Sequence, residues 1–204
     1  HGYGEVVPRR QGLSISGGSY IGGGSNAESN GRVQAEDVVA TLDYVVAQPW
    51  ADKAHLVVMG QSHGGWTTLA FGTRGYPGVR GLANFAGGLR QEGCVAWKDG
   101  LIGAAAAYGK EARLPSIWFY GDNDSYFEPY VWRGMYESYT AAGAKAELVA
   151  FGVFPSGDSH RMFGSKEGAP IWEPALAAFL RTVGMPWKAR TKSDAPANSE
   201  GAEP

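Results

Sequence analysis

The sequence predicts an α/β protein with a mostly parallel sheet flanked by helices, and two observations support this class. Four short apolar runs show little alternation between apolar and polar residues, which is typical of strands buried on both faces of a sheet. Segments of helical period lie between these runs, and a repeated strand–helix–strand order is typical of parallel sheets. The predicted strands are residues 56–59, 79–85, 117–120 and 146–151, each bounded by Gly or Pro.

The first helix is predicted to begin near Glu36 and Asp37, because acidic side chains suit the positive N-terminal end of a helix. The apolar residues that follow share one helical face: Val38, Val39, Leu42, Val45 and Val46. Three further helices are predicted over 63–73, 127–142 and 171–183, the last with Pro174 near its start and Gly184 past its end. The long connection between 87 and 114 predicts an additional helix near Ala104–Ala107.

The composition indicates a single domain and excludes several classes of protein. The chain has 204 residues, of which 44% are apolar, so there is enough apolar material for a buried core. A net charge of −2 argues against a general binder of nucleic acids or anionic membranes. No apolar run approaches the roughly 18–20 residues that cross a bilayer. The single cysteine, Cys94, rules out an internal disulfide and an all-cysteine metal site.

The predicted domain spans residues 1–185, and residues 186–204 are predicted to be a disordered tail. No Val, Ile, Leu, Met, Phe or Tyr follows Trp187, so the tail has little to bury. Within the domain, residues 16–30 are rich in Gly, Ser and Asn and are predicted to form a surface loop. This loop lacks the glycine spacings that cradle phosphates in nucleotide-binding proteins.

The motif G-x-S-x-G occurs at Gly60-Gln61-Ser62-His63-Gly64, between an apolar run and a segment of helical character. At such a strand-to-helix elbow the serine is held in a strained turn, and flanking glycines avoid clashes. The elbow places the Ser62 hydroxyl at the C-terminal edge of the sheet, beside a helix N-terminus. The backbone N–H of His63 is there a candidate donor to an oxyanion. Ser62 is therefore the candidate nucleophile.

A serine hydroxyl needs a neighbouring base to become a nucleophile near neutral pH. His160 is the preferred base because it lies in a polar loop that follows the last predicted strand. The other histidines fit this role less well. His63 adjoins the nucleophile and points elsewhere on the elbow, His55 precedes its strand at the opposite edge of the sheet, and His1 is terminal.

The imidazole in turn needs a carboxylate that fixes its tautomer. Asp124 is preferred, because it lies far enough past the strand 117–120 for its loop to turn towards His160. Asp122 is an alternative that could instead cap the turn, and Asp158 is a more remote alternative that fits a local turn. With Asp124 as the acid, the chain order is nucleophile, acid, base, as in the α/β-hydrolases.

These motifs resemble those of the dienelactone hydrolase-like branch of the α/β-hydrolase superfamily. The resemblance covers about residues 3–183 and rests on Gly60–Gly65, Trp118–Asp124 and the loop around Asp158–His160. It implies the α/β-hydrolase fold and an esterase-like serine hydrolase with Ser62, Asp124 and His160 as its triad. Such chemistry requires no metal and no organic cofactor. Dienelactone hydrolases carry Cys where this chain has Ser62, and this difference favours a small-molecule carboxylic ester as substrate.

The resemblance also concerns the start of the chain. Residues 5–12, followed by Ser16-Gly17-Gly18, look like a strand and loop that lie inside the family's fold. The chain begins with His1 and has its first methionine at Met59. We therefore expect the early strands, half of the oxyanion hole and the natural start to be missing. Relatives with this pattern are often exported bacterial proteins, which favours export here.

Aromatic residues beside the motifs are candidates for lining the substrate pocket: Tyr126, Phe127 and Phe163. Trp66 fits core packing better, and Cys94 fits either a structural role or pairing with a cysteine in the missing segment. Two other functions compete with the esterase hypothesis. A serine peptidase of the prolyl-oligopeptidase type shares the triad order and usually carries an additional β-propeller. A non-catalytic binding protein on the hydrolase fold would be expected to lack a member of the triad.

Overall fold

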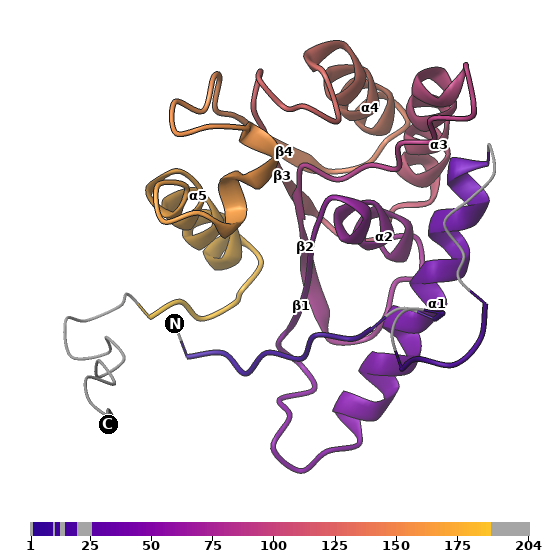
Figure 1. Cartoon of the computed structure of the whole chain (residues 1–204). Helices are drawn as coiled ribbons and strands as arrows, with labels where there is room; N and C mark the ends of the chain where they lie inside the picture. The colour runs from indigo at the N-terminus through magenta and orange to yellow at the C-terminus, as the bar shows by residue number, and fades with distance from the viewer. Residues whose placement is uncertain (1, 10, 13–14, 20–25, 189–204) are drawn as a thin grey trace, which may run out of the picture.

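The computed structural model describes residues 2–9, 11–12, 15–19 and 26–188 (Figure 1). Its centre is a four-stranded parallel sheet in which the strands follow chain order. The predicted class, a mostly parallel sheet flanked by helices, is confirmed. The strands are β1 (Leu56–Gln61), β2 (Val79–Phe85), β3 (Ser116–Tyr120) and β4 (Ala146–Ala150), close to the four predicted apolar runs.

Helices cover both faces of this sheet (Figure 1). One face carries α1 (Ala27–Val46), α2 (His63–Phe71), α3 (Trp97–Glu111) and α4 (Pro129–Ala141). The other carries the 3-10 helix η1 (Ser159–Gly164) and α5 (Ala169–Thr182). The helix predicted near residues 104–107 is therefore present as α3. Within the described ranges, no helix is both long and apolar enough to cross a bilayer.

Two aromatic-rich cores hold the layers together. The core beneath α1–α4 contains the fully buried Trp66, Trp118 and Trp132, so the packing role predicted for Trp66 is confirmed. On the α5 face, the rings of Phe85 and Phe119 stack with centroids 4.6 Å apart. Side chains of this size each remove about 150–250 Å² from water. Aromatic packing on both faces of the sheet therefore fixes the positions of the strand ends.

Helix α1 begins at Ala27, well before its predicted start, so the surface loop predicted over 16–30 is wrong for its last residues. The Asn26 side chain caps the helix by accepting a backbone N–H of the first turn at 2.8 Å. The early turns pack through small residues, and a Cβ on Gly31 would lie 2.2 Å from the Tyr108 hydroxyl oxygen. A search for apolar periodicity misses a helix face of this kind.

The N-terminal segment is irregular where the sequence predicts a strand over residues 5–12. In the described chain, residues 2–9 belong to no strand or helix, and Val6 and Val7 are exposed. A strand gains its stability from a hydrogen-bonded neighbour, and these residues pair with none of the four strands. The prediction of a strand is therefore wrong for the described residues 5–9 and 11–12.

Two other predicted boundaries differ from the structure, and two predicted segments lie partly outside the described residues. Pro174 lies inside α5, which begins at Ala169 and has its N-terminal proline at Pro170. Trp187, at the start of the predicted tail, still packs against the α5-side core. Residues 20–25 of the predicted loop and 189–204 of the predicted tail lie outside the described residues.

The register of the sheet brings the C-terminal ends of the strands to one edge. Gln61 at the end of β1 is paired with Phe85, Phe85 with Phe119, and Phe119 with Val149. The loops that follow β1, β2, β3 and β4 therefore start side by side. In open α/β sheets this edge is where ligands bind.

Candidate active site

Ser62 occupies a strained turn between β1 and α2, with φ 54° and ψ −124°. A non-glycine residue in such a conformation costs about 1–3 kcal/mol and persists only where its surroundings fix it. The Ser62 N–H donates to the carbonyl of Phe85 at 2.9 Å, and its carbonyl accepts from the N–H groups of Trp66 at 3.0 Å and Gly88 at 3.1 Å. The predicted strand–turn–helix elbow is present.

Glycines make room for this elbow on both sides of the serine. A Cβ on Gly60 would lie 2.2 Å from the carbonyl oxygen of Gly64, and one on Gly65 would lie 2.4 Å from Asn84 Oδ1. Contacts this short do not occur, so the turn requires glycine at both positions. His63 is the first residue of α2, which places its backbone N–H at the positive end of the helix dipole.

Asp124 lies in the loop after β3, and its side chain has no exposed surface. Its Oδ1 accepts the backbone N–H groups of Tyr126 at 2.8 Å and Phe127 at 2.9 Å. Two backbone donors to one oxygen leave the side chain little freedom to rotate. The loop thus holds the Asp124 side chain in a fixed orientation at the edge of the sheet where the strands end.

His160 is the second residue of η1, and its side chain is 9% exposed. Its Nδ1 lies 3.1 Å from Asp124 Oδ1 and 3.0 Å from Asp124 Oδ2. If Asp124 is a carboxylate, which only accepts hydrogen bonds, this contact requires the proton on Nδ1 and leaves a lone pair on Nε2. This is the tautomer that a general base needs. The structure therefore brings together the two residues that the sequence analysis paired.

Gln61 links the serine elbow to the histidine. Its side-chain Nε2 donates to the carbonyl oxygen of His160 at 2.6 Å, which ties η1 to the end of β1. The residue that precedes Ser62 thus touches the backbone of His160. Among the described residues, Ser62 Oγ itself has no hydrogen-bond partner. Catalytic hydrogen bonds are often long in ligand-free enzymes and tighten with substrate.

Asp122 and His55 have partners elsewhere, and Asp158 contacts His160 only at the backbone. Asp122 forms an ion pair with Arg133 at 3.0 Å, away from the histidine. His55, just before β1, pairs with Asp52 at 2.8 Å. Asp158 accepts the N–H of His160, two residues on, at 2.9 Å, which is the local turn expected of it. It also reaches the loop that carries Asp124, a contact that the sequence analysis did not foresee.

A buried network behind the elbow also escaped the sequence analysis. Asn84 Nδ2 donates to the hydroxyl oxygen of Tyr120 at 3.0 Å, and that hydroxyl donates to the carbonyl of Gly87 at 2.6 Å. Burial raises the pKa of Tyr120 well above its ordinary value, so the hydroxyl stays protonated and keeps its role as donor. The network fixes the loop whose next residue, Gly88, binds Ser62. A polar Asn84 within an apolar strand was the available signal.

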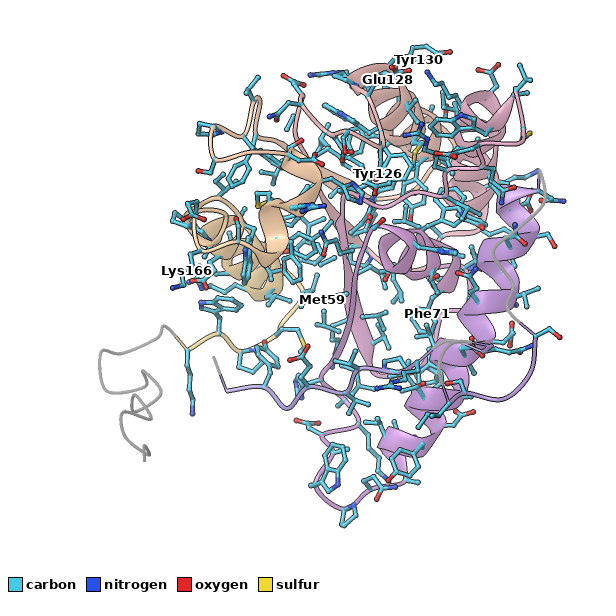
Figure 2. The ribbon with its side chains drawn as sticks, viewed as in Figure 1. Met59, Phe71, Tyr126, Glu128, Tyr130 and Lys166 are labelled. Atoms are coloured by element: carbon cyan, nitrogen blue, oxygen red, sulfur yellow. The ribbon has the colours of Figure 1, made fainter. Side chains whose placement is uncertain are left out.

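The three pocket candidates occupy different surroundings. Tyr126 is 46% exposed, lies near the upper ends of the strands in Figure 2, and has its ring centroid 4.4 Å from that of His160. Phe127 is buried in the core, although its ring also lies 5.6 Å from that of His160. Phe163 packs against Phe85 on the α5 side, with centroids 4.0 Å apart. Of the three, Tyr126 alone combines exposure with contact to the histidine, and pocket lining stays a prediction for all of them.

Two surface hollows lie away from this edge. One, of about 530 Å³, is lined by the start of α1 and by residues of α3. The other, of about 770 Å³, lies near Tyr76 and Arg80, at the opposite end of the sheet. Neither contains a member of the predicted triad, so the chemistry of the side chains identifies the site better than volume does. The described ranges hold no group of three His, Cys, Asp or Glu side chains suited to a metal ion.

A serine in a positive-φ turn between a parallel strand and a helix, with a buried Asp–His pair at the same edge, is characteristic of the α/β-hydrolases. Solved structures agree with this class. A dienelactone hydrolase candidate from Klebsiella pneumoniae has a TM-score of 0.55 and 19% identity, over 74% of this chain and 62% of its own. A puromycin-hydrolyzing peptidase of Mycobacterium tuberculosis has a TM-score of 0.54 and 20% identity, over 77% of this chain and 26% of its own. Esterase PE8 has a TM-score of 0.52 and 17% identity, over 77% and 63%.

The sequence also assigns the chain to a particular family of this class. Residues 6–110, just over half of the 204, match the model of the prolyl oligopeptidase family, and the chain belongs to that family. No curated protein matches it. The chain spans less than two thirds of the length of each of the three solved structures described above. The predicted membership of the α/β-hydrolases, with likeness to a dienelactone hydrolase in fold, is confirmed.

Proposed function

We propose that this protein is a serine hydrolase that cleaves carboxylic esters through an acyl-enzyme intermediate. Ser62 is the nucleophile, His160 the general base and Asp124 the group that orients the base. One observation carries the proposal: the buried pair of Asp124 and His160, with contacts of 3.0 and 3.1 Å, lies at the sheet edge where the elbow holds Ser62.

The reaction proceeds in two halves. In the first, Ser62 Oγ passes its proton to His160 Nε2 and attacks the ester carbonyl carbon, and the backbone N–H of His63 donates to the oxyanion. The C–O bond to the alcohol then breaks, and the alcohol leaves with the proton from His160. In the second half, water attacks the acyl-serine while His160 takes its proton and returns it to Ser62 Oγ. Asp124 stabilises the transient imidazolium.

The alternative substrate is a peptide, and the family membership favours it. Residues 6–110 match the prolyl oligopeptidase family, and the similar structures include several peptidases. The esterase assignment rests on the resemblance of the motifs to dienelactone hydrolases, since a serine nucleophile serves both reactions. Comparing 4-nitrophenyl butyrate with peptidyl 4-nitroanilides separates the two. Turnover of the ester without turnover of the less reactive peptidyl anilides supports our proposal, and turnover of the anilides replaces it with the peptidase.

The activated serine can be tested without a known substrate. Intact mass spectrometry after reaction with a fluorophosphonate should show one adduct, and peptide mapping should place it on Ser62. Ser62→Ala should give no adduct and retain its circular dichroism spectrum. Ser29→Ala, which changes an exposed serine in α1, is the matched control and should react like the unmodified chain. No adduct on the unmodified chain, or an adduct on another residue, contradicts the proposal.

A further inference from the structure

The candidate acid and base lie on two separate loops. Asp124 belongs to the segment after β3, residues 121–128, which we call the acid loop. The segment after β4, residues 151–158, leads into η1 and His160, and we call it the base loop. The distance between Asp124 and His160 therefore depends on the contacts between the acid loop and the base loop.

Asn123, the residue before Asp124, reaches from the acid loop to the base loop. Its Nδ2 donates to the carbonyl oxygens of Phe154 at 3.1 Å and Gly157 at 2.8 Å. Its Oδ1 accepts the N–H of Phe154 at 2.8 Å. The amide nitrogen and the amide oxygen of Asn123 are thus both hydrogen-bonded to the backbone of the base loop.

Asp158 connects the base loop to Ser125 of the acid loop. Its Oδ2 accepts the Ser125 hydroxyl at 2.6 Å, and its Oδ1 accepts the Ser125 N–H at 3.1 Å. The same Oδ1 accepts the N–H of His160 at 2.9 Å. Ser125 directly follows Asp124, so Asp158 joins the neighbour of the acid to the backbone of the base.

We propose that Asn123 and Asp158 are positioning residues that form a reciprocal clamp and hold Asp124 at catalytic distance from His160. The proposal rests on the proposed function. Neither side chain needs to touch substrate, because Asn123 acts through the backbone of the base loop, and Asp158 acts through Ser125 and the backbone of His160. Without the clamp, Asp124 still accepts its hydrogen bonds from Tyr126 and Phe127. We therefore expect loss of the clamp to loosen the contact between Asp124 and His160 while leaving the fold in place. A misplacement of about 1 Å can cost on the order of 100-fold in rate.

A role in positioning can be distinguished from a role of charge. An asparagine at 158 keeps an oxygen that can accept from Ser125 and His160, and its amide can face the Ser125 hydroxyl oxygen. Asp158→Asn should therefore rescue what Asp158→Ala loses. If the carboxylate instead served to stabilise the protonated His160, Asp158→Asn would be as damaging as Asp158→Ala. Asp122→Ala is the matched control, since it removes an acid-loop carboxylate that binds Arg133 and not the base loop.

The experiment measures kcat and KM for 4-nitrophenyl butyrate in four variants: Asn123→Ala, Asp158→Ala, Asp158→Asn and Asp122→Ala. Proton NMR also follows the far-downfield signal of the proton between His160 Nδ1 and Asp124. We expect the two clamp alanine variants to lose about 10- to 100-fold in kcat with little change in KM, and to weaken or lose the downfield signal. Asp158→Asn and Asp122→Ala should retain most of both.

Three results would overturn the clamp. They are unchanged kcat and signal in Asp158→Ala, an Asp158→Asn variant as impaired as Asp158→Ala, and a loss that falls on KM alone. Should Asp158→Ala not fold, Ser125→Ala removes one of the three bonds and should show a smaller loss in the same direction. The NMR signal requires only the Asp124–His160 pair. If the unmodified chain neither reacts with fluorophosphonate nor hydrolyses esters, the proposed function fails, and the signal still decides whether the clamp positions the pair.

Discussion

Gln61 Nε2 donates to the carbonyl oxygen of His160 at 2.6 Å, so the residue before the candidate nucleophile holds the backbone of the candidate base. The two residues lie 99 positions apart in the chain. The bond joins the end of β1 directly to η1. The clamp by contrast joins the loops after β3 and β4, so the histidine is held from both sides.

Replacing Gln61 with Leu removes this donor and keeps a side chain of similar size. We expect kcat for 4-nitrophenyl butyrate to fall by about tenfold, because η1 loses its connection to the serine elbow. The lost hydrogen bond should lower the free energy of unfolding by about 1 kcal/mol. Steady-state kinetics and urea unfolding measure the two effects. A variant that loses stability but retains kcat would show that the bond supports the fold alone.

Asp124→Asn tests the tautomer argument. The amide oxygen can still accept the N–H groups of Tyr126 and Phe127, which then turns the amide NH₂ towards His160 Nδ1. That nitrogen must accept a hydrogen bond, so the proton moves to Nε2 and the base is lost. We expect kcat to fall by about 10⁴-fold, the loss that such a change causes in a Ser-His-Asp protease.

Fluorophosphonate labelling of Ser62 in Asp124→Asn should slow in parallel with turnover of the ester. Asp122→Asn is the control, since its carboxylate pairs with Arg133. Equal losses in the two variants would remove Asp124 from the triad.

Sequence reasoning found the parts of this site that have a local pattern. The elbow at Ser62 follows from glycine spacing next to an apolar run, and the positions of Asp124 and His160 follow from strand ends that share one edge. The strands themselves were predictable because buried parallel strands are continuous apolar runs. The Asp–His contact confirms that these loops meet.

Contacts between distant segments left no such pattern. Gln61 occupies a variable position of the elbow motif, and nothing in the sequence pairs it with His160. Asn123 and Asp158 are residue types common in turns, and nothing in the sequence pairs Asn123 with the base loop or Asp158 with Ser125. The first half of α1 was missed for a related reason, since Gly31 packs closely against Tyr108 without an apolar side chain.

Gly65→Ala tests the close packing behind the elbow. The added Cβ would lie 2.4 Å from Asn84 Oδ1 and 2.7 Å from the Cα of Gly87, and the backbone at Gly87 cannot move without shifting the loop that binds Ser62. We expect the free energy of unfolding to fall by about 1–3 kcal/mol, with loss of ester turnover.

Gly64→Ala is the matched control, because an added Cβ there meets no atom within 4 Å. An alanine inside α2 should leave stability unchanged or raise it by up to about 1 kcal/mol. Urea unfolding of both variants measures the difference. If the two substitutions change stability equally, close packing does not explain the glycine at position 65.

Asp158 should make the stability of the protein depend on pH. Burial alone would raise the pKa of Asp158, but hydrogen bonds from Ser125 and from the N–H of His160 hold that pKa below its ordinary value. A carboxyl group with a lowered pKa in the folded state contributes stability above its unfolded pKa of about 3.9, and loses it as the pH falls through the folded pKa. The difference in unfolding free energy between the unmodified chain and Asp158→Asn should therefore be constant above about pH 5 and shrink below about pH 4.

Urea unfolding of the two proteins at about pH 6 and about pH 3 measures this change, since the Asp158 carboxyl is ionised in both states at the higher value and is largely protonated in the unfolded chain at the lower one. In a Ser125→Ala background the pH-dependent part of the difference should be smaller, because the hydroxyl that donates to Asp158 Oδ2 is gone. A stability difference that is the same at both pH values would mean that the ionised form of Asp158 is no better bound in the folded protein than in the unfolded chain. The clamp would then hold the loops without any preference for a charged carboxylate.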